Sequence, residues 1–440
     1  MEGIATLPRS PFGANQRVGD FPSTWLPRLR FNGPDRSPFV VYRRRNVLDS
    51  AQVDHSPLSR DDIDVIDSSG RVLYFGCRNF VEKIAAGTTC FICGADPTTA
   101  TFNDEHVIPD WILANYGLHS RQITLTNAAH LLYGQYTVPC CENCNGLMSS
   151  AFESPISKAV KRGYPEVQKY VENGGLSQVY QWLALIYLKT HLKDRHLRFH
   201  LDRRKGDATL AHLYDWRDLH HVHCIARAFY TNAVLGAGAI GSILVCPVRQ
   251  IKGEEPFDYA DSYDGSTILL QLGDTAFLAV LNDACAVLSA LNVDLQRITG
   301  PLSSIQLREL LARMAFTNLH LVERPKLLSG FEALYSHPAL PNIVLATGEY
   351  AITAECPDMV EVEAVEPTKL GTLLSFYVRG PARALLGAEN GDRLIAQLAD
   401  GLHSTIFGDE GEFLVNPAPQ GDEDIRPVEI QHVSYTPRHS

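Results

Sequence analysis

The chain of 440 residues is 45% hydrophobic and 20% charged, a composition typical of globular proteins and long enough for roughly two or three domains. Its formal net charge of -11 argues against a protein that coats nucleic acid with its whole surface, although it allows a local basic face. The sequence has no run of about eighteen apolar residues, and its start lacks the basic and apolar segments of a signal peptide. We therefore expect a cytoplasmic protein without a membrane span.

Residues 1–84 are expected to form an N-terminal arm with a small β region. Up to about residue 60 the chain is rich in Pro, Arg and Asp, and its one apolar stretch, 39–42, favours a strand. Residues 64–67 and 72–75 flank a Ser-Ser-Gly sequence, which is typical of a hairpin. A short helix over 80–86 should follow.

Residues 85–165 are expected to contain strands, a long loop and a helix. The elements predicted in order are a strand at 99–102, a turn of helix at 111–113, a loop over 118–132 and a return strand at 136–138. A helix should then begin near Cys144, and Pro155 is expected to break it.

Beyond this region we expect a helical extension over 166–205 and a mixed α/β domain of unknown role over 206–440. Helices are predicted at 176–191, 210–230 and 303–322, and strands at 239–245, 267–271 and 276–281. Ser303 or Ser304 is the expected N-cap of the last helix. After Pro325 we expect short strands that alternate with turns, and about the last twenty residues should be mobile.

The cysteines are too few for a disulfide scaffold, and clustered cysteines in a reducing compartment more often hold metal. Cys90 and Cys93 form one Cys-x-x-Cys clip, and Cys141 and Cys144 form a second. Four thiolates in two such clips can complete a tetrahedral zinc site without a further ligand. Cys140 is a rival ligand, but Cys141 has the two-residue spacing with Cys144, so we expect Cys140 to be a small buried apolar residue.

An acid–His pair lies between the clips, and an Asn follows the second clip. Hydrolysis of a phosphodiester needs an activated water, a Lewis acid and in-line positioning. A neutral imidazole can accept the proton of a water at neutral pH, so His106 is a candidate general base. Glu105 and the amide oxygen of Asn145 are hard oxygen ligands of the kind that suits Mg²⁺ or Mn²⁺.

The order Cys90-x-x-Cys93, Glu105-His106-x-x-Pro109 and Cys141-x-x-Cys144-Asn145 resembles the HNH endonucleases (His-Me finger, ββα-metal) in their zinc-stabilised form. The resemblance covers roughly residues 88–160, under a fifth of the chain. It implies an α+β protein whose ββα-metal nuclease module carries a treble-clef-like site for structural Zn²⁺. It also implies that Glu105 and Asn145 bind a catalytic Mg²⁺ or Mn²⁺, while His106 acts as general base.

One position departs from the family pattern. An Asn usually lies a few residues before the second clip, where it fixes the loop and orients the catalytic His, but this chain has Gly134-Gln135-Tyr136 there. Asn127, further upstream, is the substitute that we predict, and Gln135 is a second candidate. A chain that has the HNH fold but no longer cleaves therefore remains an alternative.

Other side chains are weaker candidates for function. Four basic residues could hold DNA, or could simply be solvated: Lys158, Lys161, Arg162 and Arg198. His119 and His130 lie in the predicted loop and could contact phosphate, although solvated loop histidines are more common. His220 and His223 would share one face of a helix, but they have no third ligand, so packing is the expected role.

The function expected from these features is metal-dependent endonucleolytic hydrolysis of DNA, with RNA as a second candidate substrate. HNH modules joined to a long second domain are associated with bacterial antiviral defence and mobile elements. The C-terminal region would then bind a partner protein or small-molecule activator that gates the nuclease. Assembly into a homo-oligomer is a further possibility that the sequence allows. The alternative is a zinc-dependent nucleic-acid-binding protein with an inactive HNH fold, in which Asn145 is a helix cap.

Overall fold

The computed structural model describes residues 63–418, except for residues 126, 128, 338–339 and 341. The strand expected at 39–42 and the expected mobile C-terminal segment lie outside the described residues. The described chain is a mixed α/β protein with several sheets. Within it, no helix is both long and apolar enough to cross a membrane.

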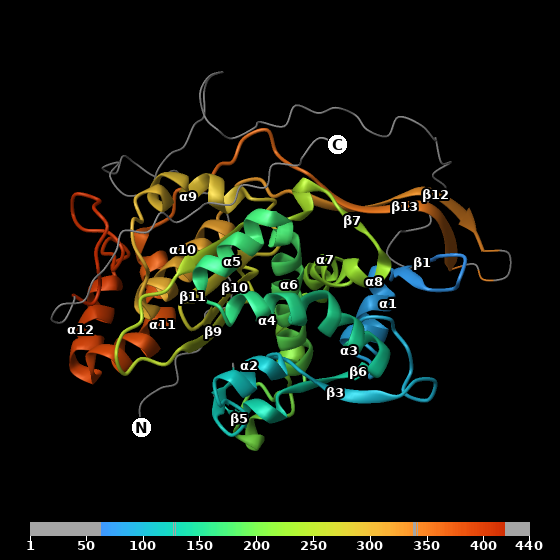
Figure 1. The fold of residues 1–440 in the computed structure, drawn as a ribbon, viewed down its shortest axis with the longest axis horizontal. Helices are drawn as coiled ribbons and strands as arrows, with labels where there is room; N and C mark the ends of the chain where they lie inside the picture. Colours follow the sequence, from blue (N-terminus) through green and yellow to red (C-terminus); the bar gives the residue numbers. More distant parts are fainter. Residues whose placement is uncertain (1–62, 126, 128, 338–339, 341, 419–440) are drawn as a thin grey trace.

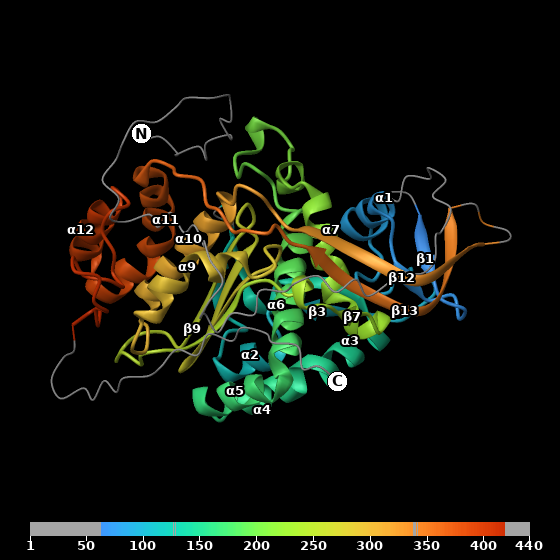
Figure 2. The same cartoon turned by 90° about the horizontal axis from the view of Figure 1, so that it is seen from above.

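An antiparallel sheet with the strand order β8-β11-β10-β9 lies between two layers of helices (Figure 2). Its strands are β8 (Ile243–Pro247), β9 (Phe257–Ser262), β10 (Thr267–Leu272) and β11 (Thr275–Val280). Every side chain of β10 and β11 is buried, and alternate residues enter two different cores, Leu270 on one face and Leu269 on the other. The side-chain period of two in a strand therefore lets one sheet serve both cores.

Helix α6 (Leu176–Asp194) packs against one face of this sheet and runs through the middle of the molecule (Figure 1). Most of its residues are buried, including the polar Lys189, Thr190 and His191. The rings of Trp182 and Phe277 lie 5.9 Å apart, centroid to centroid, and the Tyr187 hydroxyl donates to the carbonyl of Ser262. The opposite face of the sheet is covered by α9 (Ala286–Gln296), α10 (Ser304–Leu319), α11 (Pro367–Leu386) and α12 (Ala388–Leu398).

A second sheet joins residues from both ends of the described chain. Its order is β12-β13-β1-β2, with β7 beside β13. The strands are β1 (Asp64–Ile66), β2 (Val72–Tyr74), β7 (Val234–Leu235), β12 (Lys326–Ser336) and β13 (Ile343–Glu355). β1 pairs in parallel with β13, so the N-terminal hairpin depends on a strand almost 300 residues later, since Asp64 pairs with Ile343.

Two short helical segments precede the first clip, two hairpins lie between the clips, and a chain of short helices follows the second clip. The segments from 77 to 141 are α1 (Cys77–Asn79), η2 (Phe80–Ala85), β3 (Phe102–His106), α2 (Asp110–Asn115), β4 (Gln122–Thr124), β5 (His130–Leu132), η3 (Tyr133–Gln135) and β6 (Thr137–Cys141). Next come α3 (Glu142–Met148), η4 (Ser149–Glu153), α4 (Ser154–Val160), α5 (Tyr164–Tyr170) and η5 (Val171–Gly175). After α6 follow η6 (Arg203–Lys205), η7 (Leu210–Leu213), α7 (Trp216–Ala226), α8 (Ala228–Thr231) and η8 (Ala237–Ala239).

Most of the expected elements are present, but the strand expected at 99–102 begins only at Phe102, and the helix expected at 210–230 is divided into η7, α7 and α8. Three further expectations were wrong. Pro155 does not break the helix, because it lies in the first turn of α4, where the missing N–H is tolerated. The predicted loop 118–132 contains the β4–β5 hairpin. Past Pro325 the chain forms two long strands and then α11 and α12 instead of short strands and turns.

One hydrophobic core runs across the domain boundaries expected near 85 and 205. It includes Val65 before the first boundary, Ile108 and Leu183 between the two, and Phe277 and Ile352 beyond the second. The nuclease-like region and the sheet therefore share a core, even though the domain limits themselves stay a prediction.

A buried carboxyl lies where α6 meets β9. Burial raises the pKa of Asp261 to about 6, while a hydrogen bond with Tyr259 and the charge of Arg308 act in the opposite direction. His191 Nε2 of α6 lies 3.5 Å from an Asp261 carboxyl oxygen, and burial lowers the pKa of this imidazole. The Asp261 side chain is 23% exposed, so solvent screens part of its charge.

We expect Asp261→Asn to stabilise the protein above pH 6 but not near pH 4. A carboxyl whose pKa is higher in the folded state contributes stability below its unfolded pKa, and this contribution disappears as the pH rises through the folded value. The variant should gain about 1–2 kcal/mol of unfolding free energy over wild type at pH 7, after discounting for solvent. Urea unfolding between pH 4 and 7 measures this difference. The exposed Asp358→Asn is the control, and a pH-independent difference for Asp261→Asn would contradict the assignment.

Candidate metal centre and histidine cluster

The first clip is a tight turn closed by backbone hydrogen bonds. The Gly94 N–H donates to the Cys90 carbonyl at 2.8 Å, and the Cys90 N–H donates to the Ala95 carbonyl at 2.9 Å. The Ala95 N–H also points at Cys93 Sγ, 3.4 Å away. Gly94 has φ +75°, and a Cβ at this position would lie 2.6 Å from the Phe75 ring, so the turn requires glycine. These contacts turn both sulfur atoms of the clip to one side.

The second clip lies where β6 becomes α3. Cys141 is the N-cap residue of α3 and Cys144 lies in its first turn, a spacing of three that places both on one face of the helix. The four sulfur atoms of Cys90, Cys93, Cys141 and Cys144 all lie within 4.8 Å of one another. The two clips therefore converge into a cluster that could bind a metal ion.

Cys140 is buried and lies outside this group of four. Its sulfur lies 3.8 Å from Cys90 Sγ and also approaches the Cys141 carbonyl. Hydrogen bonds from Cys140, Cys144 and Cys93 lower the pKa of Cys90, whereas the Cys90 and Cys93 sulfurs raise the pKa of Cys144. One cysteine of the cluster therefore loses its proton easily, and its negative charge then opposes deprotonation of the others. All four cysteines can be thiolates together only when a cation lies among them.

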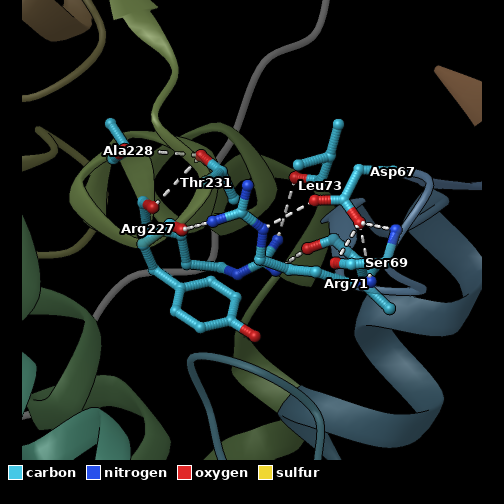
Figure 3. A network of polar contacts seen from close by, with 9 residues as sticks. Asp67, Ser69, Arg71, Leu73, Arg227, Ala228 and Thr231 are labelled. Carbon is cyan, nitrogen blue, oxygen red and sulfur yellow. Dashed lines mark hydrogen bonds and ion pairs between the residues drawn. The ribbon is translucent and has the colours of Figure 1, made fainter. Parts of the chain in front are cut away.

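Two buried side chains after α6 hold the first clip by its carbonyl groups. The Nε2 of His223 in α7 donates to the Phe91 carbonyl at 2.8 Å, and Arg227 Nε donates to the Ile92 carbonyl. The Arg227 guanidinium also donates to the Leu73 carbonyl, so it joins the clip to the β1–β2 hairpin. Figure 3 shows Arg227 together with Leu73 and Arg71 of this hairpin region. Arg71 next to it pairs with Asp67 and donates to the Tyr230 carbonyl. The histidines of α7 therefore pack, as expected, and His220 likewise donates to the Phe75 carbonyl.

The β3–β6 hairpin links the cysteine cluster to the acid–His pair. Phe102 pairs with Cys141 at one end, and His106 pairs with Thr137 at the other. The four steps of strand between Phe102 and His106 span about 13 Å. An ion in the cysteine cluster is therefore too far from His106 for both to act on one phosphodiester bond. Catalysis at His106 would use either a second ion or no ion at all.

Glu105 and His106 point to opposite faces of this hairpin. Glu105 is only 7% exposed, and one of its oxygens accepts a 2.8 Å hydrogen bond from Lys189 Nζ of α6. The same ammonium donates to the His106 carbonyl at 2.7 Å. Glu105 thus already has a buried cationic partner, which the sequence reasoning missed.

His106 instead faces Asp110 of α2 and His119 of the following loop. The His106 Nδ1 lies 3.8 Å and the His119 Nε2 2.8 Å from one oxygen of Asp110. The two rings are nearly perpendicular, with centroids 6.0 Å apart. All three potential ligand atoms lie within 4.8 Å of one another. Asp110 lies four residues after His106, and this spacing is a signal in the sequence that could have identified it.

Among the described residues, neither of the two predicted Asn side chains forms a hydrogen bond with His106. Asn145 is half-buried in α3, and no hydrogen bond links it to Glu105 or His106 among the described residues. Asn127 donates to the Arg198 carbonyl at 2.8 Å and accepts from the Ala129 N–H at 3.0 Å, so its amide fixes its own loop. The roles expected for Asn145 and Asn127 stay predictions.

Another carboxyl group lies close to this site. Burial raises the pKa of Glu153 in η4 to about 7, with the Lys189 ammonium lowering it and the charges of Glu105 and Asp110 raising it further. Glu153 therefore lies near enough to Lys189, Glu105 and Asp110 for their charges to act on it.

The four basic residues predicted to hold DNA lie on two parts of the surface. Lys158, Lys161 and Arg162 are exposed in and just after α4, whereas the Arg198 guanidinium pairs with Asp207. A hollow of about 230 Å³ lies along the hairpin, and its lining includes Lys193, Arg195 and His196 together with Thr137, the strand partner of His106. The sequence had indicated Arg198, just after this basic stretch, but not the hollow.

No family model matches the chain, and searches of curated proteins and of solved structures likewise give no significant match. The resemblance to the HNH endonucleases therefore rests on the two clips, on the segment from Glu105 to Pro109 and on Asn145.

Proposed function

We propose that residues 85–165 form an HNH-type nuclease module that hydrolyses phosphodiester bonds of DNA. The observation that carries this proposal is the order of parts along the β3–β6 hairpin and α3. The cysteine cluster lies at one end of the hairpin, and a partly exposed His106 with its polar partners lies at the other. A rigid metal-bound end and a solvent-accessible histidine end are what such a module needs.

The ion that we propose for the cysteine cluster is structural Zn²⁺. Four sulfur ligands and no oxygen or water ligand are typical of closed, structural zinc sites. Zn²⁺ with four thiolates carries two net negative charges, and the buried Arg227 guanidinium next to Ile92 would offset part of them. This counter-charge supports an anionic cluster at the clip.

His106 is the residue on which the proposed catalysis depends. The resemblance gives its imidazole the task of accepting the proton of the attacking water, and the side chain is 25% exposed, so water can reach it. Lys189 holds the His106 carbonyl and thereby fixes the end of β3. A divalent ion bound at this end would stabilise the negative charge that develops on the leaving oxygen.

The substrate proposed is DNA, with RNA as the second candidate. Phosphate contacts require cations that can reach the backbone; exposed basic residues lie in and just after α4, and the partly exposed Lys193 lines the hollow beside Thr137. A role in bacterial defence or a mobile element, with the C-terminal region as the sensor of a partner or activator, stays a prediction from the resemblance.

We expect His106→Ala to lower DNA cleavage by at least about 100-fold, because proton transfer by a positioned side chain contributes roughly that much. The assay is nicking of plasmid DNA by the full chain with Mg²⁺ or Mn²⁺. The matched control is His403→Ala, which removes an exposed histidine that also pairs with an aspartate, Asp400, but in the C-terminal region. That variant should cut like wild type.

Two results would contradict the proposal. Cleavage by His106→Ala at the wild-type rate would remove His106 from the chemistry. If wild type and variant both retard DNA in a gel but neither cuts it, the chain is a nucleic-acid-binding protein with an inactive HNH fold.

A further inference from the structure

We infer that His106, Asp110 and His119 form a binding site for one divalent transition-metal ion, separate from the cysteine cluster. The site differs from the one that the resemblance implies, because it uses neither Glu105 nor Asn145. Its use in hydrolysis rests on the proposed function, whereas binding of the ion does not.

The distances within the cluster fit an ion. Nitrogen and oxygen ligands bind such metals at about 2.0–2.2 Å, so two adjacent ligand atoms lie roughly 3.0–3.5 Å apart in octahedral or tetrahedral geometry. Asp110 Oδ1 lies 2.8 Å from His119 Nε2, a hydrogen bond that an ion would replace, and 3.8 Å from His106 Nδ1. Both distances are close to the range for ligands of one ion, so only small side-chain shifts would be needed.

The three ligands come from elements that the fold fixes. His106 ends β3, and Asp110 begins α2 directly after Pro109, the N-cap residue. The loop that carries His119 is held by its backbone, since the Gly134 N–H donates to the His119 carbonyl at 3.2 Å. A Cβ at Gly134 would lie 3.1 Å from that carbonyl oxygen, a tight contact, so glycine favours this close approach. The site is therefore largely pre-formed.

The exposure of the cluster indicates what kind of site it is. The side chains of His106, His119 and Asp110 are 25%, 47% and 65% exposed, so several coordination positions of an ion would face solvent. Open positions are typical of sites that act on a substrate, whereas structural sites are closed by protein ligands. The cysteine cluster is therefore like a closed, structural metal site, and the histidine cluster is like an open metal site that binds a substrate.

The ligand types indicate which metals should bind. Two imidazoles and one carboxylate suit Mn²⁺, Co²⁺, Ni²⁺ or Zn²⁺, while Mg²⁺ prefers oxygen ligands alone. Glu105, the ligand that the resemblance implies, already pairs with the buried Lys189, and replacing that ammonium by an ion would leave a buried charge unpaired.

Binding of the ion also changes the role of His106. An imidazole that ligates through Nδ1 keeps its proton on Nε2, and so it cannot accept the proton of the attacking water. With the ion bound, the ion would activate the water in place of His106. The inferred site therefore replaces the general-base role that the proposed function takes from the resemblance, and measuring Mn²⁺ binding separates the two roles.

The test is a titration of the zinc-containing full chain with Mn²⁺, with the free ion followed by electron paramagnetic resonance. Wild type should bind one Mn²⁺ more tightly than it binds Mg²⁺. His119→Ala and Asp110→Asn should weaken binding at least about tenfold, as loss of a ligand does. Glu105→Gln and Asn145→Ala should bind as wild type, and so should the control His403→Ala. Circular dichroism confirms that each variant is folded.

Each outcome bears on one proposal. Mn²⁺ binding that survives His119→Ala, or that is lost in Glu105→Gln or Asn145→Ala, overturns the histidine site. Binding that follows the expected pattern in a chain that cuts no DNA supports the site and overturns the nuclease. Cleavage by wild type together with full Mn²⁺ binding by His119→Ala supports the nuclease and overturns the histidine site.

Discussion

Cys93→Ser is expected to release most of the bound zinc and to lower the melting temperature steeply. Cys93 lies in a group of four converging sulfurs, and its loss leaves three thiolates for an ion that binds four. Structural zinc contributes on the order of 10 kcal/mol of binding free energy, which is comparable to the roughly 5–15 kcal/mol that stabilises a whole domain. Elemental analysis and calorimetry of the same sample measure both effects.

Cys140→Ala is the matched control for this prediction. Cys140 is buried next to the cluster, 3.8 Å from Cys90 Sγ, but it is not a member of the group of four. The variant should keep its zinc and lose only about 1 kcal/mol from the small cavity. Full zinc in Cys93→Ser, or loss of zinc in Cys140→Ala, would mean that the ligands are assigned wrongly.

Lys189→Met should destabilise the protein by about 3–5 kcal/mol, because it leaves the Glu105 carboxylate buried without its cation. The side chains of Lys189 and Glu105 are only 3% and 9% exposed, and the ammonium also bonds to the His106 carbonyl. The double variant Glu105→Gln/Lys189→Met should recover much of the loss. Urea unfolding of wild type, the two single variants and the double variant gives the four unfolding free energies of a double-mutant cycle.

An exposed ion pair provides the comparison for this cycle. Arg121 and Glu255 are 2.7 Å apart, but both are about half exposed, so Arg121→Met should cost under about 1 kcal/mol. If Lys189→Met costs no more than Arg121→Met, the buried pair does not form in solution. Glu105 would then be free to bind an ion, as the resemblance implies.

The elements that could be predicted from the sequence are those with local signals. The hairpin at Ser69-Gly70 is present, and Ser303 caps α10 in a capping box with Gln306. Helix α11 was missed, although Leu370, Leu374 and Val378 follow a helical period and are buried. In that segment the sequence carried a signal that the prediction of short strands overlooked.

The candidate site was only partly predictable because its members meet through the fold. The cysteine clips were recognisable by spacing alone. Lys189 is 84 residues from Glu105, and its only signal was a lysine within the largely apolar run from Val179 to Leu192. His119 reaches Asp110 because the β4–β5 hairpin shapes the loop, and that hairpin was not foreseen.

The shared core determines how this chain can be shortened. A chain cut after residue 205 would leave the apolar sides of α6 in water, and β1 would lose β13, its parallel neighbour. Such a product should collect in inclusion bodies instead of yielding a minimal nuclease. Trimming from the two termini toward residues 63 and 418 keeps every described strand pair intact, and it is the route by which we expect a smaller, well-behaved protein.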